Sequence, residues 1–342
     1  LKTFTCGFDL SSASGFELGF DERTKAEAMS ALFKTEHYEM VLKSGDMERS
    51  MTQVVTQIEE PRVGQSYPNH YVSRLASKFV KVVLSGTGGD ELFGGYPWRY
   101  FPMENGWSLD DYVDHYYSYW HRLVSNTELR RLFSPVISEV SDVWTRDIFR
   151  EVIAGHITDG SHATDVLNRS LYFEAKTFLH GLLVVEDKLS MSHGLETRVP
   201  FLDNDLVKFA ETCPAMLKVN LAAVGNKINE NDLRRKRETV HQQTSDGKKL
   251  LRRVMGNIIP ESIAQGTKQG FSSPDASWFK GESIDLVRRT FFETTPMLAN
   301  IMDISTVRSL IGEHLSGEKN RRLLIWSLFS LETLLTAGHV AG

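Results

Sequence analysis

A strand-forming run, a glycine-rich loop and an acidic helix start follow one another within residues 80–96, and together they restrict the fold more than any other stretch. The run Val80–Leu84 is apolar and rich in β-branched residues, which predicts a strand buried on both faces. It leads into the loop Ser85–Gly89, after which Asp90 and Glu91 open a predicted helix. In open α/β sheets, ligands bind at the loops that follow the carboxyl ends of strands. The stretch therefore predicts a ligand site on an α/β sheet.

The glycines and Asp90 indicate the kind of ligand. Glycines let the backbone approach a ligand closely, and free N–H groups at a helix start suit phosphate. A carboxylate at the same place would repel phosphate unless a divalent cation lay between them. We therefore expect a nucleotide site with Mg²⁺ on Asp90. The alternative is that Asp90 and Glu91 only complement the helix macrodipole. The loop alone is weak evidence, since it has neither the Walker A spacing nor the dinucleotide-binding order of glycines.

Composition excludes several classes of protein. A net charge of −5 and a sequence pI near 6.2 argue against a nucleic-acid partner, and the basic run at 234–237 is expected to be a solvated segment. Two cysteines, Cys6 and Cys213, predict no disulfide framework and fit a reducing, cytoplasmic location. The longest apolar run, around 182–185, is too short to span a membrane. The eleven histidines show no spacing typical of a zinc site.

The first hundred residues alternate between strand and helix patterns, which predicts a parallel sheet with helical crossovers. From Ser108 onward the patterns are those of amphipathic helices, and residues 219–247 are polar with little periodicity, as in a loop or insertion. The sequence opens directly with a strand pattern, so we expect it to be a piece of a longer protein. The predicted strands are 2–8, 37–42 and 80–84, and the predicted helices are 22–34, 46–59 and 69–79.

Two further blocks make the loop much more specific. Residues 185–203 read VEDKLSMSHGLETRVPFLD, and residues 267–271 read TKQGF, followed by WFKG at 278–281. In this order, the three blocks closely resemble the synthetase domain of glutamine-dependent asparagine synthetase, B type, over essentially the whole chain. The resemblance implies a parallel α/β layer of the adenine-nucleotide α-hydrolase-like (PP-loop ATPase) fold at residues 1–104. It also implies a mostly helical part at residues 105–342 that completes the same domain.

The activity of this family is then the expected function. The resemblance implies an AMP-forming ligase that binds ATP and Mg²⁺, adenylates the side-chain carboxylate of aspartate and lets ammonia displace AMP. The ammonia would come from a glutaminase domain that is not part of this sequence. Neither nucleic acid nor a membrane is an expected partner, and a homodimer is one of the assemblies open to the chain.

The family motif Ser-Gly-x-Gly-x-Asp-Glu falls on the loop after the predicted strand. The resemblance implies that Ser85, Gly86 and Gly88 bind the nucleotide and that Asp90 holds Mg²⁺. Cys6 falls where the family lines the adenine pocket with a small apolar residue.

Other residues match the family in the second and third blocks. Lys268 matches a lysine that approaches the phosphate and the acyl-adenylate, where an ammonium would stabilise negative charge. An ordinary surface lysine is the alternative. Glu196 and Arg198 match a family pair to which we assign a structural role, and Glu186 and Asp187 are further candidates to reach the cleft.

Three departures from the family pattern matter. The pyrophosphate loop expected just upstream of Leu1 is absent, and so is the N-terminal cysteine nucleophile, so the isolated chain is expected to be inactive and unable to hydrolyse glutamine. Thr87 stands where the family has an acidic residue tied to forming the acyl-adenylate, which makes it a catalytic and substrate-determining candidate. The alternatives are an amide-forming relative similar to β-lactam synthetases or peptide cyclases, and a non-catalytic subunit that keeps the fold.

Overall fold

The structure is a computed structural model, and it describes eight stretches of the chain. Within them, none of the helices combines the length and the apolar character needed to cross a membrane. The TKQGF block with Lys268 lies outside the described residues, as does most of the predicted polar segment. The described residues are 1–13, 15–64, 66–100, 108–121, 123–155, 163–220, 247–266 and 272–340.

The predicted N-terminal alternation of strands and helices is confirmed, with boundaries that differ by a few residues. Local sequence explains two helix starts. In α2 the carboxylate of Asp46 accepts a hydrogen bond from the backbone N–H of Lys43 at 2.7 Å, and in α3 Pro68 occupies the first turn, where a missing N–H costs nothing. The elements are β1 (Lys2–Phe8), α1 (Arg23–Phe33), β2 (Glu36–Leu42), α2 (Ser44–Ile58), α3 (Tyr67–Ala76), β3 (Val82–Leu84) and α4 (Gly89–Phe93).

The strands form two separate pairs within the described residues. β1 pairs in parallel with β2, from Lys2 opposite Glu36 to Phe8 opposite Leu42. β3 pairs in parallel with β4 (Glu196–Arg198), a strand more than a hundred residues further along the chain. The expectation of parallel pairing is therefore confirmed, whereas a single continuous sheet is not present among the described residues. Sequence patterns contain no strand signal for β4, because its three residues are all polar.

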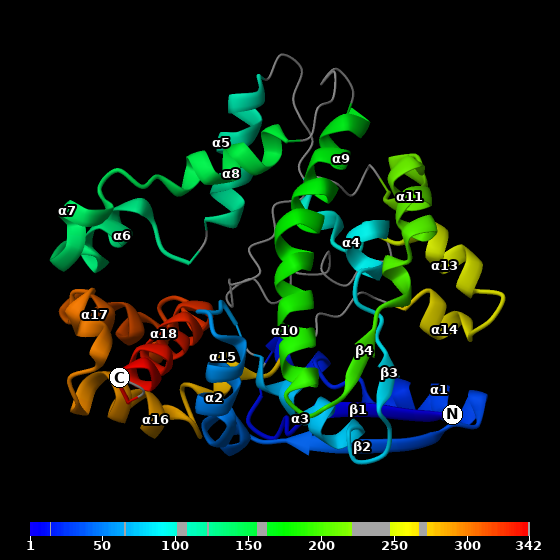
Figure 1. Ribbon diagram of the computed structural model, residues 1–342, viewed down its shortest axis with the longest axis horizontal. Coiled ribbons are helices and arrows are strands. Elements are labelled where there is room, and N and C mark those ends of the chain that lie inside the picture. The colour runs from blue at the N-terminus through cyan, green and yellow to red at the C-terminus, as the bar shows by residue number, and fades with distance from the viewer. Residues whose placement is uncertain are drawn as a thin grey trace.

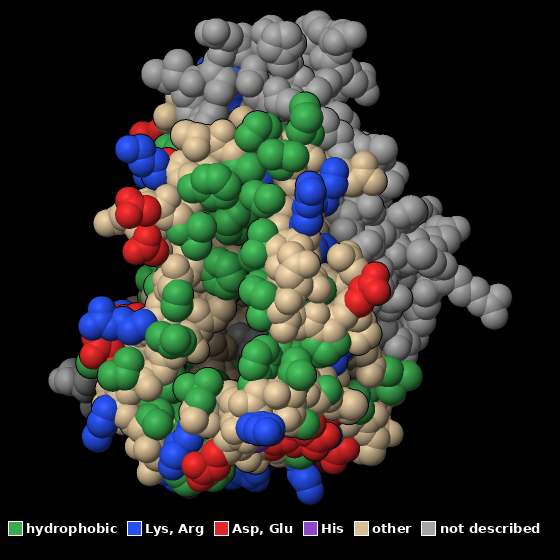
Figure 2. All heavy atoms as spheres, turned by 90° about the vertical axis from the view of Figure 1, so that its right-hand side faces the viewer, with side chains coloured by type: hydrophobic (Ala, Val, Ile, Leu, Met, Phe, Trp, Pro, Cys, Tyr) green, Lys and Arg blue, Asp and Glu red, His purple; other side chains and the backbone are tan. Residues whose placement is uncertain are grey.

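The prediction that the strand at 80–84 is buried on both faces is wrong. The side chains of Val82 and Leu84 are 51% and 74% exposed. An apolar, β-branched run indicates a strand but not how many of its faces are covered, and among the described strands β3 pairs only with the short polar strand β4. Figure 2 shows hydrophobic side chains gathered on the side of the molecule where Figure 1 places β3, α11 and α13, and exposed residues there include Phe209 and Val254.

The rest of the described chain is mostly helical, as expected. Figure 1 shows α9 and α10 running one after the other through the middle of the molecule, and a π-helical turn at Ala175–Leu179 joins them without a break. The helices are α5 (Leu109–Trp120), α6 (Asn126–Leu132), α7 (Ile137–Val140), α8 (Thr145–Ala154), α9 (Ala163–Glu174), α10 (His180–Met191), α11 (Asn204–Thr212), α12 (Ala215–Lys218), α13 (Lys249–Met255), α14 (Glu261–Ala264), α15 (Asp275–Trp278), α16 (Ile284–Arg288), α17 (Ile304–Leu315) and α18 (Arg322–Val340).

The largest hydrophobic core joins the two ends of the chain. It contains Phe8 of β1 and Leu42 of β2 together with Trp278 of α15 and Ile325 of α18, all nearly inaccessible to solvent. Burying side chains of this size contributes about 2 kcal/mol each to folding. The N-terminal strands and the C-terminal helices are therefore held by one core.

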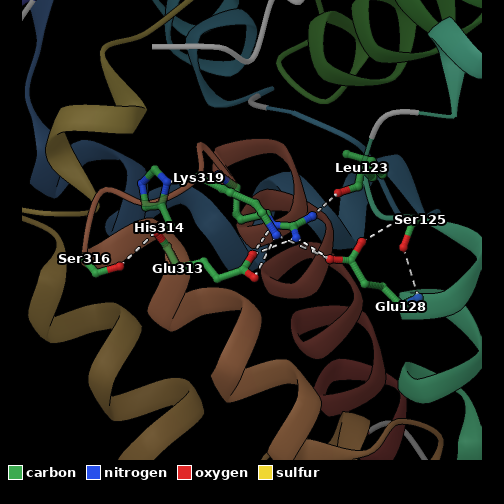
Figure 3. Close-up of polar contacts among 8 residues, drawn as sticks. Leu123, Ser125, Glu128, Glu313, His314, Ser316 and Lys319 are labelled. Carbon is green, nitrogen blue, oxygen red and sulfur yellow. Dashed lines mark hydrogen bonds and ion pairs between the residues drawn. The ribbon is translucent and has the colours of Figure 1, made fainter. Parts of the chain in front are cut away.

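Arg321 connects the C-terminal helices to α6. Figure 3 shows Glu128 of α6 and Glu313 of α17 pointing toward each other. The guanidinium of Arg321 donates to the carbonyl of Leu123 at 3.0 Å and to the carboxylates of Glu128 and Glu313. Burial alone would raise the pKa of Glu128, but hydrogen bonds from Ser125 and Arg321 outweigh it and lower that pKa to about 2. Both carboxylates thus stay charged and hold the buried arginine in place.

α10 is anchored to the N-terminal part by polar contacts near its C-terminal end. The ammonium of Lys188 donates to the carbonyl of Ile58 and to the carboxylate of Glu59, both at 2.8 Å. One turn later the imidazoles of His70 and His193 share a hydrogen bond of 3.2 Å. These contacts fix the position of α10 against α2 and α3.

The histidine pair should make folding stability depend on pH. Burial, with smaller contributions from His193 and Arg74, lowers the pKa of His70 from 6.5 to about 4. The folded state therefore binds fewer protons than the unfolded state between these values, so the free energy of unfolding should fall as pH drops from about 6.5 to about 4, by up to about 3 kcal/mol. Urea unfolding across this range measures the slope, which His70→Asn should reduce. The exposed His180→Asn is the control, and an equal slope in all three proteins would contradict the prediction.

Candidate functional site

The loop at 85–89 begins where β4 holds the end of β3. The backbone N–H of Ser85 donates to the carbonyl of Arg198 at 2.8 Å, which extends the parallel pairing by one residue into the loop. The backbone of Gly88 has a φ of +96°, a conformation that L side chains rarely adopt. A Cβ at Gly88 would lie 2.6 Å from Leu202, whereas one at Gly86 would meet nothing within 4 Å. Gly88 thus shapes the loop, and Gly86 leaves one side of it open.

A carboxylate from α10 reaches this loop. The hydroxyl of Thr87 donates to Oε2 of Glu186 at 2.6 Å and lies 3.0 Å from the hydroxyl of Ser85. Glu186 was one of two acidic candidates from the second block, and the structure brings it to the loop. Its neighbour Asp187 is exposed.

Asp90, the predicted Mg²⁺ ligand, lies in the first turn of α4 and forms an ion pair with Lys248. Their Nζ and Oδ1 atoms are 2.9 Å apart. Gly95 makes room for this carboxylate, since a Cβ there would collide with it. The adjacent Glu91 instead turns inward, where it is buried and accepts a hydrogen bond from the hydroxyl of Tyr96. Asp90 is therefore the acid available to a ligand, and Glu91 supports the fold.

Sequence patterns did not single out Lys248, or Arg252 one helical turn further on. Lys248 lies at the start of α13, where a cation is unfavourable for the helix dipole, and this was the signal that could have marked it. The buried guanidinium of Arg252 donates to the carbonyls of Gly247, Ala264 and Gly266. It therefore fixes the chain immediately before the TKQGF block.

A metal ion here would depend on Asp90. The described residues contain no group of three or more His, Cys, Asp and Glu side chains arranged to hold a metal. Mg²⁺ does not require such a group, because it commonly keeps several waters and binds one or two carboxylates together with substrate phosphates. A single carboxylate beside an open glycine loop fits that pattern once the ammonium of Lys248 moves away from one oxygen of Asp90 and leaves it to the metal ion.

The remaining predicted residues lie on other elements. Cys6 lies in β1, half-buried, and its Sγ is 3.9 Å from the carbonyl of Pro68; burial raises the pKa of its thiol to about 12. A thiol that stays protonated behaves as a small apolar group, which is compatible with the adenine-pocket prediction but does not test it. Glu196 and Arg198 pair with each other on the exposed strand β4, with Nη2 and Oε1 2.5 Å apart.

The two loop glycines offer a matched pair of substitutions. Gly88→Ala should reduce the free energy of unfolding by about 2 kcal/mol or more, because of the positive φ and the collision with Leu202. Gly86→Ala should leave unfolding unchanged and weaken nucleotide binding, since its methyl group would occupy the open side. Urea unfolding and titration with a fluorescent ATP analogue measure the two effects. Equal stability of the two variants would contradict the loop geometry.

Comparisons with known proteins point to one family. The family model described as "Asparagine synthase" matches residues 1–336. A Mycobacterium tuberculosis (strain ATCC 25618 / H37Rv) protein named "Putative asparagine synthetase (glutamine-hydrolyzing)" is 28% identical, over 96% of this chain and 49% of its own length. The Bacillus subtilis (strain 168) protein named "Asparagine synthetase (glutamine-hydrolyzing) 1" is 25% identical, over 96% of this chain and 51% of its own length. The chain thus spans about half the length of these curated relatives.

Proposed function

The chain belongs to the asparagine synthase family, and we propose that it is the synthetase domain, without the glutaminase domain, of a protein that carries out the ATP-dependent amidation of a carboxylate, most directly of aspartate to asparagine with ammonia derived from glutamine. The observation that carries this proposal is the loop between β3 and α4. It combines the hydroxyls of Ser85 and Thr87, the open position at Gly86 and the carboxylate of Asp90. A phosphate chain with its metal ion requires this combination of donors, space and negative charge.

The proposed reaction has two steps. In the first, an oxygen of the substrate carboxylate bonds to the α-phosphorus of ATP, and the bond to the β-phosphate breaks with its electron pair leaving on pyrophosphate. In the second, the nitrogen of ammonia bonds to the acyl carbon and loses a proton, and AMP leaves with the electron pair of the carbon–oxygen bond. Negative charge collects on phosphate oxygens in both steps, so cations and N–H donors at those oxygens lower the barrier.

Each described residue then has a physical role. Ser85, Gly86 and Gly88 would hold the nucleotide through a hydroxyl and through close approach of the backbone. Asp90 would hold Mg²⁺, which neutralises phosphate charge when bound. Lys248 already neutralises Asp90 at 2.9 Å, and it would turn to a phosphate oxygen when the metal takes its place.

Several assignments do not rest on described contacts, and most of them rest on the family resemblance. Lys268 is proposed to approach the α-phosphate and the acyl group, and Cys6 to line the adenine pocket. The division into an α/β part at 1–104 and a helical part at 105–342 of one synthetase domain is proposed on the same basis. A cytoplasmic location is proposed from the two cysteines, which predict no disulfide framework.

A second candidate function follows from Thr87. At this position the chain has an uncharged hydroxyl where the family has an acid. This difference favours an enzyme that adenylates a different carboxylate and forms an amide with an internal amine. The two functions differ in whether free ammonia is consumed.

Product analysis of the whole protein tests the proposal. With ATP, Mg²⁺, aspartate and ammonium, we expect equal amounts of AMP, pyrophosphate and asparagine, and ¹⁸O from labelled aspartate should appear in AMP. Asp90→Asn should reduce the rate about 100-fold or more, because loss of a metal ligand costs several kcal/mol in the transition state. The exposed Asp205→Asn is the matched control. Formation of ADP and phosphate would overturn the proposal, and AMP formation without consumption of ammonia would favour the second candidate.

A further inference from the structure

We propose that Glu186 is a positioning residue of the nucleotide loop, and that α10 thereby supplies the carboxylate that the loop lacks at Thr87. This inference rests on the proposed function, because it assigns Glu186 to formation of the acyl-adenylate. Three features of the described residues support it: the direction of the hydrogen bonds, the anchoring of α10 and the way β4 connects the two.

The hydrogen bonds among these side chains have one consistent direction. A carboxylate only accepts, so the single hydroxyl proton of Thr87 points to Oε2 of Glu186, 2.6 Å away. The hydroxyl of Ser85, 3.0 Å from that of Thr87, must then donate to it. The backbone N–H of Thr87 donates in turn to the oxygen of Ser85 at 3.3 Å. Glu186 therefore sets the orientation of both hydroxyls, including that of a predicted nucleotide-binding residue.

The backbone around Glu186 is rigid enough for this task. Its neighbours Val185 and Leu189 are buried in the main core, and Lys188 ties the same turn to Ile58 and Glu59. Because α10 and the end of β3 are both fixed, the 2.6 Å contact between the hydroxyl of Thr87 and Oε2 of Glu186 joins two residues whose backbones are held in place. A surface hydrogen bond between two long, free side chains would have no such support.

The connection from α10 to the loop is also short. α10 ends at Met191, and β4 begins at Glu196 and pairs with β3, which leads straight into the loop. The helix that carries Glu186 and the strand that leads into the loop of Thr87 are thus parts of one continuous unit. A purely structural bond would need only an acceptor at Glu186, whereas the proposed role also needs its negative charge beside Thr87.

Substitutions that separate the charge from the hydrogen bond test the proposal. Glu186→Gln keeps an acceptor for Thr87 but removes the charge. In the whole protein, we expect it to lower the maximal rate of aspartate-dependent ATP–pyrophosphate exchange about 10- to 100-fold, because it removes a negative charge that the proposed step uses, with less than about threefold change in KM for ATP. Thr87→Val should cause a similar loss, whereas Thr87→Ser should keep most of the rate. The control is Glu211→Gln, an exposed carboxylate of α11.

Moving the carboxylate from position 186 to position 87 gives the decisive comparison. In the Glu186→Gln background, Thr87→Glu returns a carboxylate to the loop and should recover at least about tenfold of the lost rate. Melting temperatures and binding of a fluorescent ATP analogue establish that each variant is folded. Exchange by Glu186→Gln at the wild-type rate, or no recovery in the double variant, would overturn the role of Glu186. Absence of aspartate-dependent exchange in the wild type itself would overturn the proposed aspartate substrate. In that case the same variants are compared by the AMP and ADP that they form from ATP, and this comparison decides the role of Glu186 separately.

Discussion

The anchoring of α10 is the constraint on which the site geometry depends. Lys188 binds the end of α2, His193 binds His70 of α3, and the strand that follows α10 pairs with β3. A helix held at several points along one face cannot slide or rotate independently of the elements beside it. The glycine-rich loop at 85–89, which starts directly after β3, therefore takes its position from α10 as much as from its own glycines.

The charges around the loop follow from this arrangement. Glu186 and Asp90 bring two carboxylates to one loop from α10 and α4, and Lys248 from α13 balances Asp90. Like charges near a loop destabilise it unless a cation compensates them. An ammonium from a side chain can do so without a ligand, and it can be exchanged for a metal ion. The ion pair of Lys248 and Asp90 thus already compensates one of the two carboxylates.

Sequence reasoning succeeded where the signal was local. The alternation of strands and helices, the parallel pairing and the family all followed from patterns of a few residues. β4 was missed because Glu196, Thr197 and Arg198 are polar and form a strand only through their pairing with β3. The contact between Thr87 and Glu186 joins residues 99 positions apart, and nothing in either neighbourhood specifies it. Such pairs depend on how helices pack, which local patterns do not encode.

The position of the carboxylate has a consequence for how the site can adapt. A glutamate on the loop would move with the loop, whereas Glu186 is carried by a helix fixed to the core. If the loop shifts when a nucleotide enters, the bond from Thr87 to Glu186 must lengthen or the hydroxyl must rotate. The strength of that bond then differs between the empty and the loaded loop, and a difference of this kind is what couples ligand binding to conformation. With a hydroxyl at Thr87 and the acid on α10, a negative charge still lies beside the loop, but its distance from the loop changes whenever the loop moves.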